Sequence, residues 1–276
     1  MLESDSENLT EPLVSSHPAQ PGKPDYEHYG NMAGTRAPLG ALFARQILAT
    51  CRPFLPAPLE ELDILDVGCG YGDTALELAR ACRHVVGIEP NAALFAQAQQ
   101  RKNGAGPLNL DFRSQSLYDL PDVARYHLVV LDNVFEHLPD QPLALRIISA
   151  CLRPGGVAFL LMPNKLWPVE VHYRLPFLSY LPLRLANFYL RITRRGNDYT
   201  DASYAPTYFR LRRLLNARPE LSYQFVLPGD PAATMAGAAP HYRLGMAALR
   251  RFPFLWVISK SFLVIAVKHD HDRTPG

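Results

Sequence analysis

Residues 64–73 read Ile64-Leu65-Asp66-Val67-Gly68-Cys69-Gly70-Tyr71-Gly72-Asp73. A short apolar run leads into a turn rich in glycine, and a helical pattern follows the turn. Gly68 and Gly70 permit left-handed backbone angles and carry no Cβ atom, so a small ligand can approach the main chain closely. The stretch therefore predicts a buried strand, a ligand-binding turn and the start of a helix.

The spacing of the glycines narrows the class of ligand. The dinucleotide fingerprint G-x-G-x-x-G needs its third glycine at position 73, where Asp73 stands, and glycine occurs at Gly72 instead. This spacing disfavours a pyrophosphate. Glu89 ends the next expected strand, where a carboxylate can accept hydrogen bonds from both ribose hydroxyls. A free 2′-hydroxyl is implied, which argues against a phosphorylated ribose of the NADP type.

Strand and helix patterns alternate through the middle of the chain. The expected strands are residues 62–67, 84–89, 108–113, 127–131 and 157–162, and the helices between them are residues 71–81, 92–101 and 142–152. The alternation predicts a doubly wound parallel sheet with helices on both faces. Because such sheets bind ligands beyond the carboxyl ends of their strands, the residues directly after each strand are the expected functional ones. Residues 262–268 are expected to form a closing strand.

The composition excludes several classes of protein. The 276 residues are 48% hydrophobic and 20% charged, which is typical of a globular domain and excludes a chain disordered throughout. The first eleven residues lack the basic and apolar regions of a secretory signal. The apolar stretch at residues 252–267 is interrupted by Lys260 and is shorter than the roughly 20 residues of a membrane span. We therefore expect a cytoplasmic protein, with the inner face of the membrane as an alternative location.

Two further patterns concern organisation. The four cysteines form no C-x-x-C pair, so neither a disulfide framework nor a zinc site is expected. Residues 1–30 lack apolar periodicity and are expected to be a flexible N-terminal segment. Residues 31–276 are expected to form one domain, with a lid or insertion rich in Pro, Tyr and Arg at about residues 165–221.

The near-neutral total charge conceals a division along the chain. Residues 1–164 hold 12 Lys and Arg against 19 acids, a net −7, whereas residues 165–260 hold 14 against 5, a net +9. Aromatic residues are interleaved with this positive charge. A basic, aromatic lid favours an anionic or sugar-like acceptor, or docking on an anionic membrane that carries a lipid-linked acceptor. Nucleic acid is not expected, because no nucleic-acid-binding module is present; a merely solvated basic face remains the alternative.

Five motifs in order resemble the class I S-adenosylmethionine-dependent methyltransferases, over about residues 29–164. They are the D-x-G-x-G-x-G turn at residues 66–72, the acidic Glu89, and Ser-Leu-Tyr-Asp-Leu-Pro at residues 116–121, followed by Asn-Val-Phe-Glu-His-Leu-Pro-Asp at residues 133–140 and Leu-Arg-Pro-Gly-Gly at residues 152–156. The resemblance implies a Rossmann-like, mostly parallel, seven-stranded α/β sheet whose last strand is antiparallel, with a basic aromatic lid.

The resemblance also implies roles for single residues. The backbone at Gly68 to Gly70 would hold the methionine part of S-adenosylmethionine, Glu89 the ribose, and Ser116 with the Leu117 amide the adenine. The expected cofactor-binding residues are Asp66, Gly68, Gly70, Gly72, Glu89, Ser116, Leu117 and Asn133.

Residues 136–140 resemble more narrowly the ubiquinone-biosynthesis O-methyltransferases and their small-molecule relatives. In those enzymes a Glu three residues before the Glu-His pair helps to hold a metal, and Asn133 occupies that position here. A neutral amide is a poorer ligand than a carboxylate for a hard cation, so no metal is expected.

Methyl transfer from a sulfonium is an in-line displacement, so most of the catalysis can come from aligning the reacting atoms in a dry site. A base within hydrogen-bond reach would assist a hydroxyl acceptor. His137 is the first candidate and His172 the second, although His137 could instead only support the cofactor pocket. Tyr173, Arg174 and Tyr204 are the expected acceptor-binding residues.

The sequence thus predicts a methyltransferase that acts on a small-molecule, glycan or lipid-linked acceptor, through oxygen. The lid segment at residues 167–182 resembles uncharacterised methyltransferases encoded among glycan-assembly enzymes, which favours a glycan or glycolipid hydroxyl. Two alternatives stay open: an NAD-dependent oxidoreductase, and a non-catalytic partner protein that binds S-adenosylmethionine.

Overall fold

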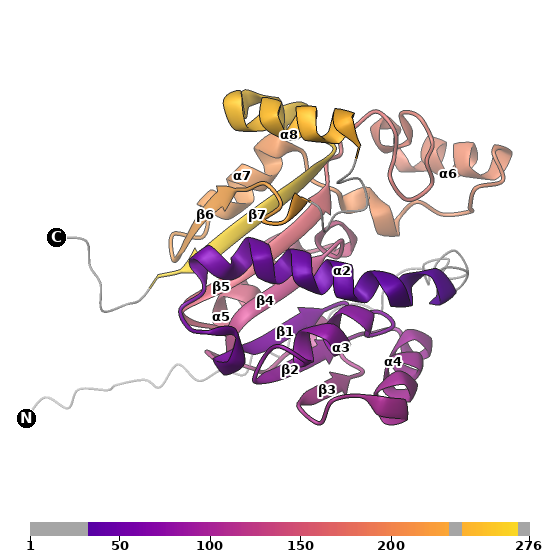
Figure 1. Cartoon of the computed structure of the whole chain (residues 1–276). Coiled ribbons are helices and arrows are strands. Elements are labelled where there is room, and N and C mark those ends of the chain that lie inside the picture. Colours follow the sequence, from indigo (N-terminus) through magenta and orange to yellow (C-terminus); the bar gives the residue numbers. More distant parts are fainter. Residues whose placement is uncertain (1–32, 232–238, 270–276) are drawn as a thin grey trace, which may run out of the picture.

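A seven-stranded sheet organises the molecule (Figure 1). The computed structural model describes residues 33–231 and 239–269, so the flexible segment expected over residues 1–30 lies outside the described residues. The strand order is β3-β2-β1-β4-β5-β7-β6, in which β1 to β5 are parallel and β7 is antiparallel to both neighbours. The strands are β1 (Asp63–Val67), β2 (His84–Ile88), β3 (Leu110–Arg113), β4 (Tyr126–Asp132), β5 (Leu152–Pro163), β6 (Leu221–Phe225) and β7 (Ser261–Lys268). The predicted fold class is confirmed.

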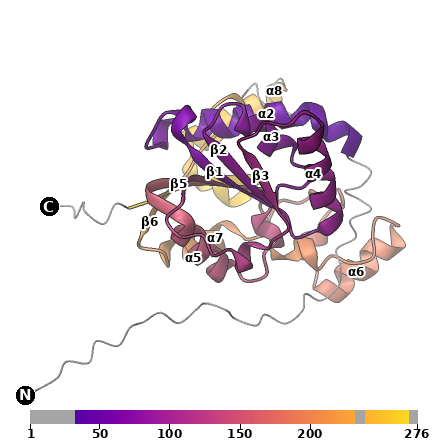
Figure 2. The ribbon, with the colours of Figure 1, turned by 90° about the horizontal axis from the view of Figure 1, so that it is seen from below.

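Helices cover both faces of the sheet (Figure 2). On one face lie α2 (Ala33–Cys51), α3 (Asp73–Ala79) and α4 (Ala92–Ala105), and on the other lie α5 (Gln141–Cys151) and α7 (Tyr208–Asn216). Two further helices are α6 (Leu183–Ile192) and α8 (Pro240–Arg251). Short 3-10 helices are η1 (Arg52–Phe54), η2 (Leu59–Glu61), η3 (Leu117–Asp119), η4 (Phe135–His137), η5 (Leu178–Tyr180), η6 (Asp201–Tyr204) and η8 (Pro253–Ile258).

Helix α5 illustrates how the sequence places these layers. Asp140 begins it as the N-cap, because its side chain accepts a hydrogen bond from the Leu143 amide at 2.9 Å. Leu145 and Ile148 follow at helical spacing, and both are fully buried against the sheet. The cap and the apolar stripe together fix where the chain returns after β4, and therefore where η4 lies.

The strands differ from expectation at their starts. β3 begins at Leu110 rather than at position 108, because Leu108 is wholly exposed before the strand enters the sheet. β5 begins at Leu152 rather than at position 157, because Leu152 already pairs with Tyr126 before a shift in register. β6 was not predicted from the sequence.

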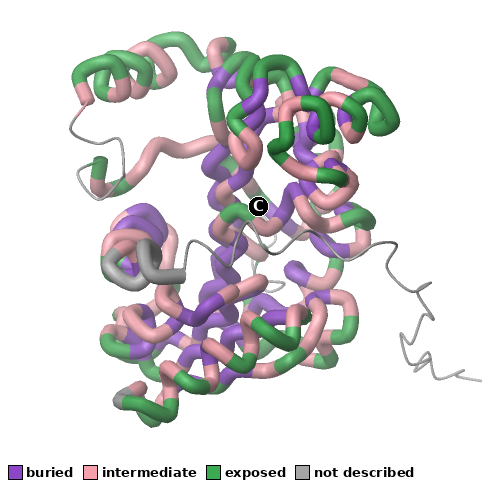
Figure 3. The backbone as a smooth tube through the Cα atoms, turned by 90° about the vertical axis from the view of Figure 1, so that its right-hand side faces the viewer, coloured by how far each residue is buried: buried purple, intermediate pink, exposed green. Residues whose placement is uncertain are grey.

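The segment at residues 165–221, which the sequence predicts to be a lid or insertion, contains two parts. Residues 165–204, here called the outer lid, enclose a small apolar cluster of their own that includes Leu178, Leu190 and Tyr199. α7, by contrast, packs Leu211 and Leu215 into the core on the sheet. Figure 3 shows the buried chain concentrated in the centre of the molecule and the exposed segments around it. The outer lid therefore stands beyond the carboxyl end of β5 as a separate packing unit.

The apolar stretch at residues 252–267, which we expected to be core, divides between η8 and β7. The expectation holds for the buried strand β7 but is wrong for the η8 part, where Trp256 is buried while Phe252, Phe254 and Ile258 are exposed. Among the described residues, no helix combines the length and apolarity that crossing a bilayer requires. All four cysteines are free thiols.

Candidate active site

The turn after β1 contains three glycines whose backbone is in the left-handed conformation, and their surroundings differ. The φ angles of Gly68, Gly70 and Gly72 are 65°, 56° and 77°. A Cβ atom on Gly68 would lie 2.7 Å from Val134 Cγ2, and one on Gly72 would collide with Phe112. A Cβ atom on Gly70 would meet no atom within 4 Å. Gly68 and Gly72 are thus required by packing, whereas Gly70 lies under open space that a ligand can enter.

Glu89 holds the turn from the tip of β2. Its Oε2 accepts a hydrogen bond from the Gly70 amide at 3.0 Å, and its Oε1 accepts one from the Asn91 amide at 2.9 Å. The side chain is buried, and burial raises the pKa of Glu89 above its usual value although the two amides oppose the shift. Glu89, the acidic residue expected after β2, therefore lies beside the glycine turn.

Asp66 gives the turn an unusual electrostatic character. It is buried, and its Oδ2 atom has no hydrogen-bond partner among the described residues. Burial, followed by the charges of Asp132 and Glu89, raises the pKa of Asp66 to about 8. Three acids that repel one another around one turn favour a cationic ligand, whose charge would relieve the repulsion.

The remaining expected cofactor residues follow β3 and β4. Ser116 caps η3, with its Oγ atom accepting from the Tyr118 amide at 3.3 Å, and Leu117 is buried in the core. Asn133 is exposed with φ 54°, and its Nδ2 atom donates to Asp132 Oδ1 at 2.7 Å. The turn and the loop after β4 meet at one edge of the sheet, because Val134 packs on Gly68.

Beside the cofactor turn, η4 and the outer lid bring together two histidines and three acids. The His137 Nδ1 atom lies 2.8 Å from Asp201 Oδ2, and the His172 Nδ1 atom lies 2.7 Å from Glu170 Oε1. The Nε2 atoms of the two histidines lie 3.8 and 3.7 Å from Glu136 Oε1. The two rings are in edge contact, with centroids 5.1 Å apart. The sequence-predicted pair, His137 and His172, is thus brought together around Glu136.

The charges within this group are set by burial and by pairing. Glu136 is completely buried, and neither carboxylate oxygen has a hydrogen-bond partner among the described residues; burial raises its pKa. Burial alone would lower the pKa of His137, but the contact with Asp201 and the charge of Glu136 outweigh it and raise the value to about 9. His137 is therefore an imidazolium at neutral pH, held between two carboxylates.

The same group offers ligand atoms for a metal. One atom each from Glu136, His137 and His172 can be chosen so that all lie within 4.8 Å of one another. The expectation of no metal rested on Asn133 alone and did not consider His172. A metal ion would have to displace the proton that His137 holds at neutral pH. The expectation of a metal-free site stays a prediction.

The three expected acceptor-binding residues lie in different environments. Tyr173 donates its hydroxyl to the Asp198 carbonyl at 3.0 Å and packs edge-on against Tyr199, so it helps to build the outer lid. Arg174 is exposed with φ 55°. Tyr204 is half-buried, and its carbonyl accepts from Gln141 Nε2 at 2.8 Å, which ties η6 to α5.

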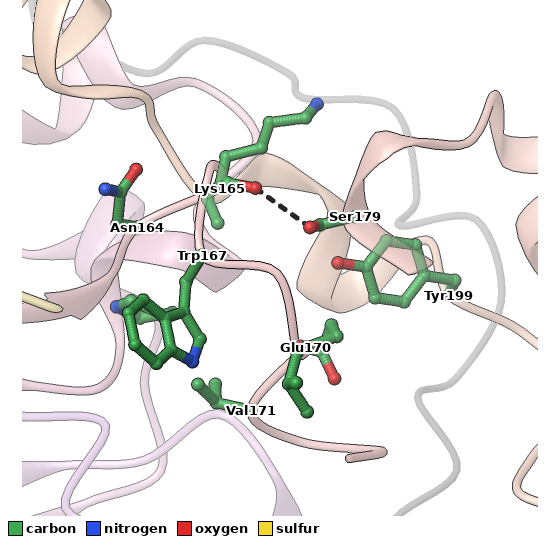
Figure 4. A pocket seen from close by; sticks show the side chains of 10 residues that line it. Asn164, Lys165, Trp167, Glu170, Val171, Ser179 and Tyr199 are labelled. Atoms are coloured by element: carbon green, nitrogen blue, oxygen red, sulfur yellow. Dashed lines mark hydrogen bonds between the residues drawn. The ribbon is translucent and has the colours of Figure 1, made fainter. Parts of the chain in front are cut away.

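A small pocket lies within the outer lid (Figure 4), and the space that a water-sized molecule can occupy in it is about 10 Å³. Trp167, Glu170 and Tyr199 are among its lining residues, and Ser179 Oγ donates to the Lys165 carbonyl at 2.8 Å across one side. Because Glu170 also contacts His172, the pocket adjoins the histidine pair.

Sequence reasoning did not select Glu170 and Asp201 as site residues. The Glu-x-His spacing of Glu170 and His172 was a usable signal, because a carboxylate two residues before a histidine can reach it in a turn. Asp201 had no local signal, since it is far from His137 in the sequence and only the folded lid brings the two together.

The raised pKa of His137 gives a stability prediction. Its folded-state pKa of about 9 exceeds the usual value of 6.5, so its contribution to stability is complete below about pH 6.5 and is lost as the pH rises through 9. Asp201→Asn removes the principal stabilising partner. We expect the variant to melt several degrees below the wild type at pH 6, and the difference to vanish above pH 9.5. Melting curves at both pH values check this, and a pH-independent difference would contradict it.

The fold and the acidic glycine turn define a domain of the class I S-adenosylmethionine-dependent methyltransferases. Residues 64–156 match the family model described as "Methyltransferase domain". The predicted family is thereby confirmed for this part of the chain.

The chain is also a distant homologue of the ubiquinone biosynthesis O-methyltransferases. It is 33% identical to that of Methylobacterium nodulans over 114 residues, which are 41% of this chain and 45% of the relative. It is 31% identical to that of Nitrobacter winogradskyi over 148 residues, which are 54% of this chain and 53% of the relative. The chain thus spans about half the length of the curated relatives it matches.

Solved structures share the fold at low sequence identity. The plantazolicin methyltransferase BpumL, in complex with S-adenosylhomocysteine and a desmethylplantazolicin analogue, has a TM-score of 0.56 at 14% identity, covering 88% of this chain and 90% of its own. A structure from Methanococcus maripaludis, described as an S-adenosyl-L-methionine-dependent methyltransferase, has a TM-score of 0.55 at 15% identity, covering 93% of this chain and 100% of its own.

Proposed function

We propose that this protein is an S-adenosylmethionine-dependent methyltransferase that transfers a methyl group to a hydroxyl of a small-molecule, glycan or lipid-linked acceptor. The observation that carries the proposal is the turn at Gly70, which is open above, held by Glu89 and surrounded by acids. When bound, S-adenosylmethionine supplies an electrophilic methyl group on a positively charged sulfur. This positive charge would be stabilised by the acids around the turn.

The residues at the turn fit the parts of that cofactor. Asp66 and the backbone at Gly68 to Gly70 would hold the methionine part, with Asp66 ionising as the positive charge arrives. Glu89 would accept from the ribose hydroxyls, and Ser116, Leu117 and Asn133 would surround the adenine. Gly72 supports them by packing closely on Phe112.

The histidine pair supplies the acid-base chemistry in this proposal. Because Glu170 is an acceptor, His172 carries its proton on Nδ1 in the neutral form, and its Nε2 atom can accept a proton. The acceptor hydroxyl would lose its proton to His172 Nε2 as its oxygen bonds to the methyl carbon and the carbon–sulfur bond breaks. The imidazolium of His137 would stabilise the developing negative charge on that oxygen. The pKa of about 9 for His137 favours His172, the second candidate from the sequence, as the base.

The outer lid supports the acceptor class. The pocket there is water-sized, so the support comes from its lining: the aromatic rings of Trp167 and Tyr199 lie beside polar groups, a combination that suits contact with a sugar-like acceptor. Arg174 at the exposed lid surface would attract an anionic acceptor. Contact with an anionic membrane, where a lipid-linked acceptor would lie, forms part of the same proposal.

The turn glycines offer a matched pair of variants. Gly68→Ala brings a methyl group against Val134, so we expect the free energy of unfolding to fall by roughly 1–3 kcal/mol and the melting temperature to fall with it. Gly70→Ala meets open space, so we expect a smaller loss of stability, due to its backbone angle alone, and a larger loss of cofactor affinity. Melting curves and calorimetric titration of both variants check the contrast, and equal effects on affinity and stability would contradict it.

The proposed activity is tested by incubating the full chain with methyl-labelled S-adenosylmethionine and cell-extract fractions, with and without EDTA. Mass spectrometry should find label on oxygen in a small-molecule or lipid fraction, equally in both arms. No label in any fraction would favour the non-catalytic alternative, label on nitrogen or carbon would refute O-methylation, and loss of label with EDTA would refute the metal-free site.

A further inference from the structure

Helix α6 has two apolar faces, of which only one is used in folding. Ala186 and Leu190 are buried in the cluster of the outer lid. Leu185, Phe188 and Ile192 are 54%, 60% and 61% exposed. Their spacing of three and four residues places them in one stripe, directed away from the buried pair. Figures 1 and 2 both show α6 at the outer edge of the molecule, away from the sheet.

A pair of aromatic residues is also exposed next to α6 in the sequence. Phe177 and Tyr180 are both exposed, with ring centroids 5.6 Å apart. Phe177 has φ 56°, a left-handed conformation that bulky residues rarely adopt. Several large apolar side chains gathered on a small projecting segment mark an interaction surface, because solvent exposure of such a group is unfavourable.

The charge on the same segment is positive and unneutralised. Arg184, Arg191, Arg194 and Arg195 are exposed, and no salt bridge joins them to a carboxylate within residues 33–231 and 239–269.

The acids of the outer lid are committed to internal contacts. Glu170 pairs with His172, Asp201 pairs with His137, and Asp198 accepts from Asn187 and Thr200. The outward surface of α6 therefore combines an apolar stripe with flanking arginines.

We propose that α6 docks in the plane of an anionic lipid bilayer, with Leu185, Phe188 and Ile192 entering the headgroup boundary and the arginines contacting lipid phosphates. The helix has 10 residues, which suits an interfacial position and is too short to span. Two of the three stripe residues are aliphatic and cannot stack on bases, which favours lipid over nucleic acid. The inference names the surface for the proposed membrane contact and does not require methyl transfer.

Sedimentation of the full chain with vesicles tests this. We expect binding to vesicles containing one-third phosphatidylglycerol and at least ~10-fold weaker binding to pure phosphatidylcholine. The combined variant Leu185→Ser, Phe188→Ser, Ile192→Ser should weaken binding at least ~10-fold. So should Arg191→Gln, Arg194→Gln, Arg195→Gln on the anionic vesicles.

The matched control is Leu108→Ser with Val123→Ser, which removes two exposed apolar side chains next to the amino ends of β3 and β4 and should leave binding unchanged. Melting temperature and affinity for S-adenosylhomocysteine should be the same in all variants, which separates failure of docking from failure of the proposed activity. Equal binding to neutral vesicles, unchanged binding by the stripe variant, or binding to RNA but not to vesicles would overturn the proposal. So would conversion of a dimer to a monomer by the stripe variant with vesicle binding unaffected.

Discussion

Glu89→Ala should weaken the binding of S-adenosylhomocysteine by at least ~30-fold. The carboxylate is buried at the tip of β2, beside the open turn at Gly70. Its loss would remove the two charge-assisted hydrogen bonds to the ribose that we propose, worth on the order of 1–3 kcal/mol each. The Gly70 amide also loses its acceptor, which loosens the turn. Calorimetric titration measures the change in Kd.

Glu77→Ala is the matched control for this variant. Glu77 lies on α3 and pairs with Arg80 near the surface, so its removal should leave the affinity unchanged. Glu89→Gln should lie between wild type and Glu89→Ala, because an amide keeps one acceptor. Wild-type affinity in Glu89→Ala would remove this residue from the cofactor site.

His172→Ala should lower the rate of methyl transfer by roughly 10²–10⁴-fold while leaving the affinity for S-adenosylhomocysteine unchanged. The variant removes the base that we propose, and His137 cannot replace it because its raised pKa keeps it protonated at neutral pH. The measurement is single-turnover transfer of labelled methyl groups into the active extract fraction.

Two further variants separate chemistry from structure. Glu170→Gln keeps the shape of the lid but no longer fixes the His172 tautomer, so we expect a smaller loss of rate and an altered pH profile. His84→Ala, a control at the amino end of β2, should have no effect on rate. An unchanged rate in His172→Ala would exclude His172 as the base. Catalysis would then rest on alignment of the reacting atoms alone.

The sheet could be predicted because its signals are local. Glycines that need left-handed angles and apolar runs of strand length each act within a few residues, and the structure confirms them. The mostly parallel seven-stranded sheet and its antiparallel last strand were expected from the family resemblance, and the structure has both.

The lid could be predicted only in outline. Its composition showed a basic, aromatic insertion, but not that α7 would pack on the sheet or that α6 would project outward. The contact between His137 and Asp201 depends on how the outer lid folds over η4, which no spacing in the sequence encodes. The site was predicted only in part for the same reason. The residues after the strands could be found from the sequence, but their partners from the lid could not, because those contacts depend on how the lid folds.

Titration of S-adenosylhomocysteine into the wild-type chain, followed by calorimetry, tests the central claim most directly. We expect binding at one site per chain, and no heat from NAD under the same conditions. Absence of binding by S-adenosylhomocysteine, or saturable binding of NAD at the same site, would contradict the assignment of the turn at Gly68 to Gly70 as a cradle for the methyl donor.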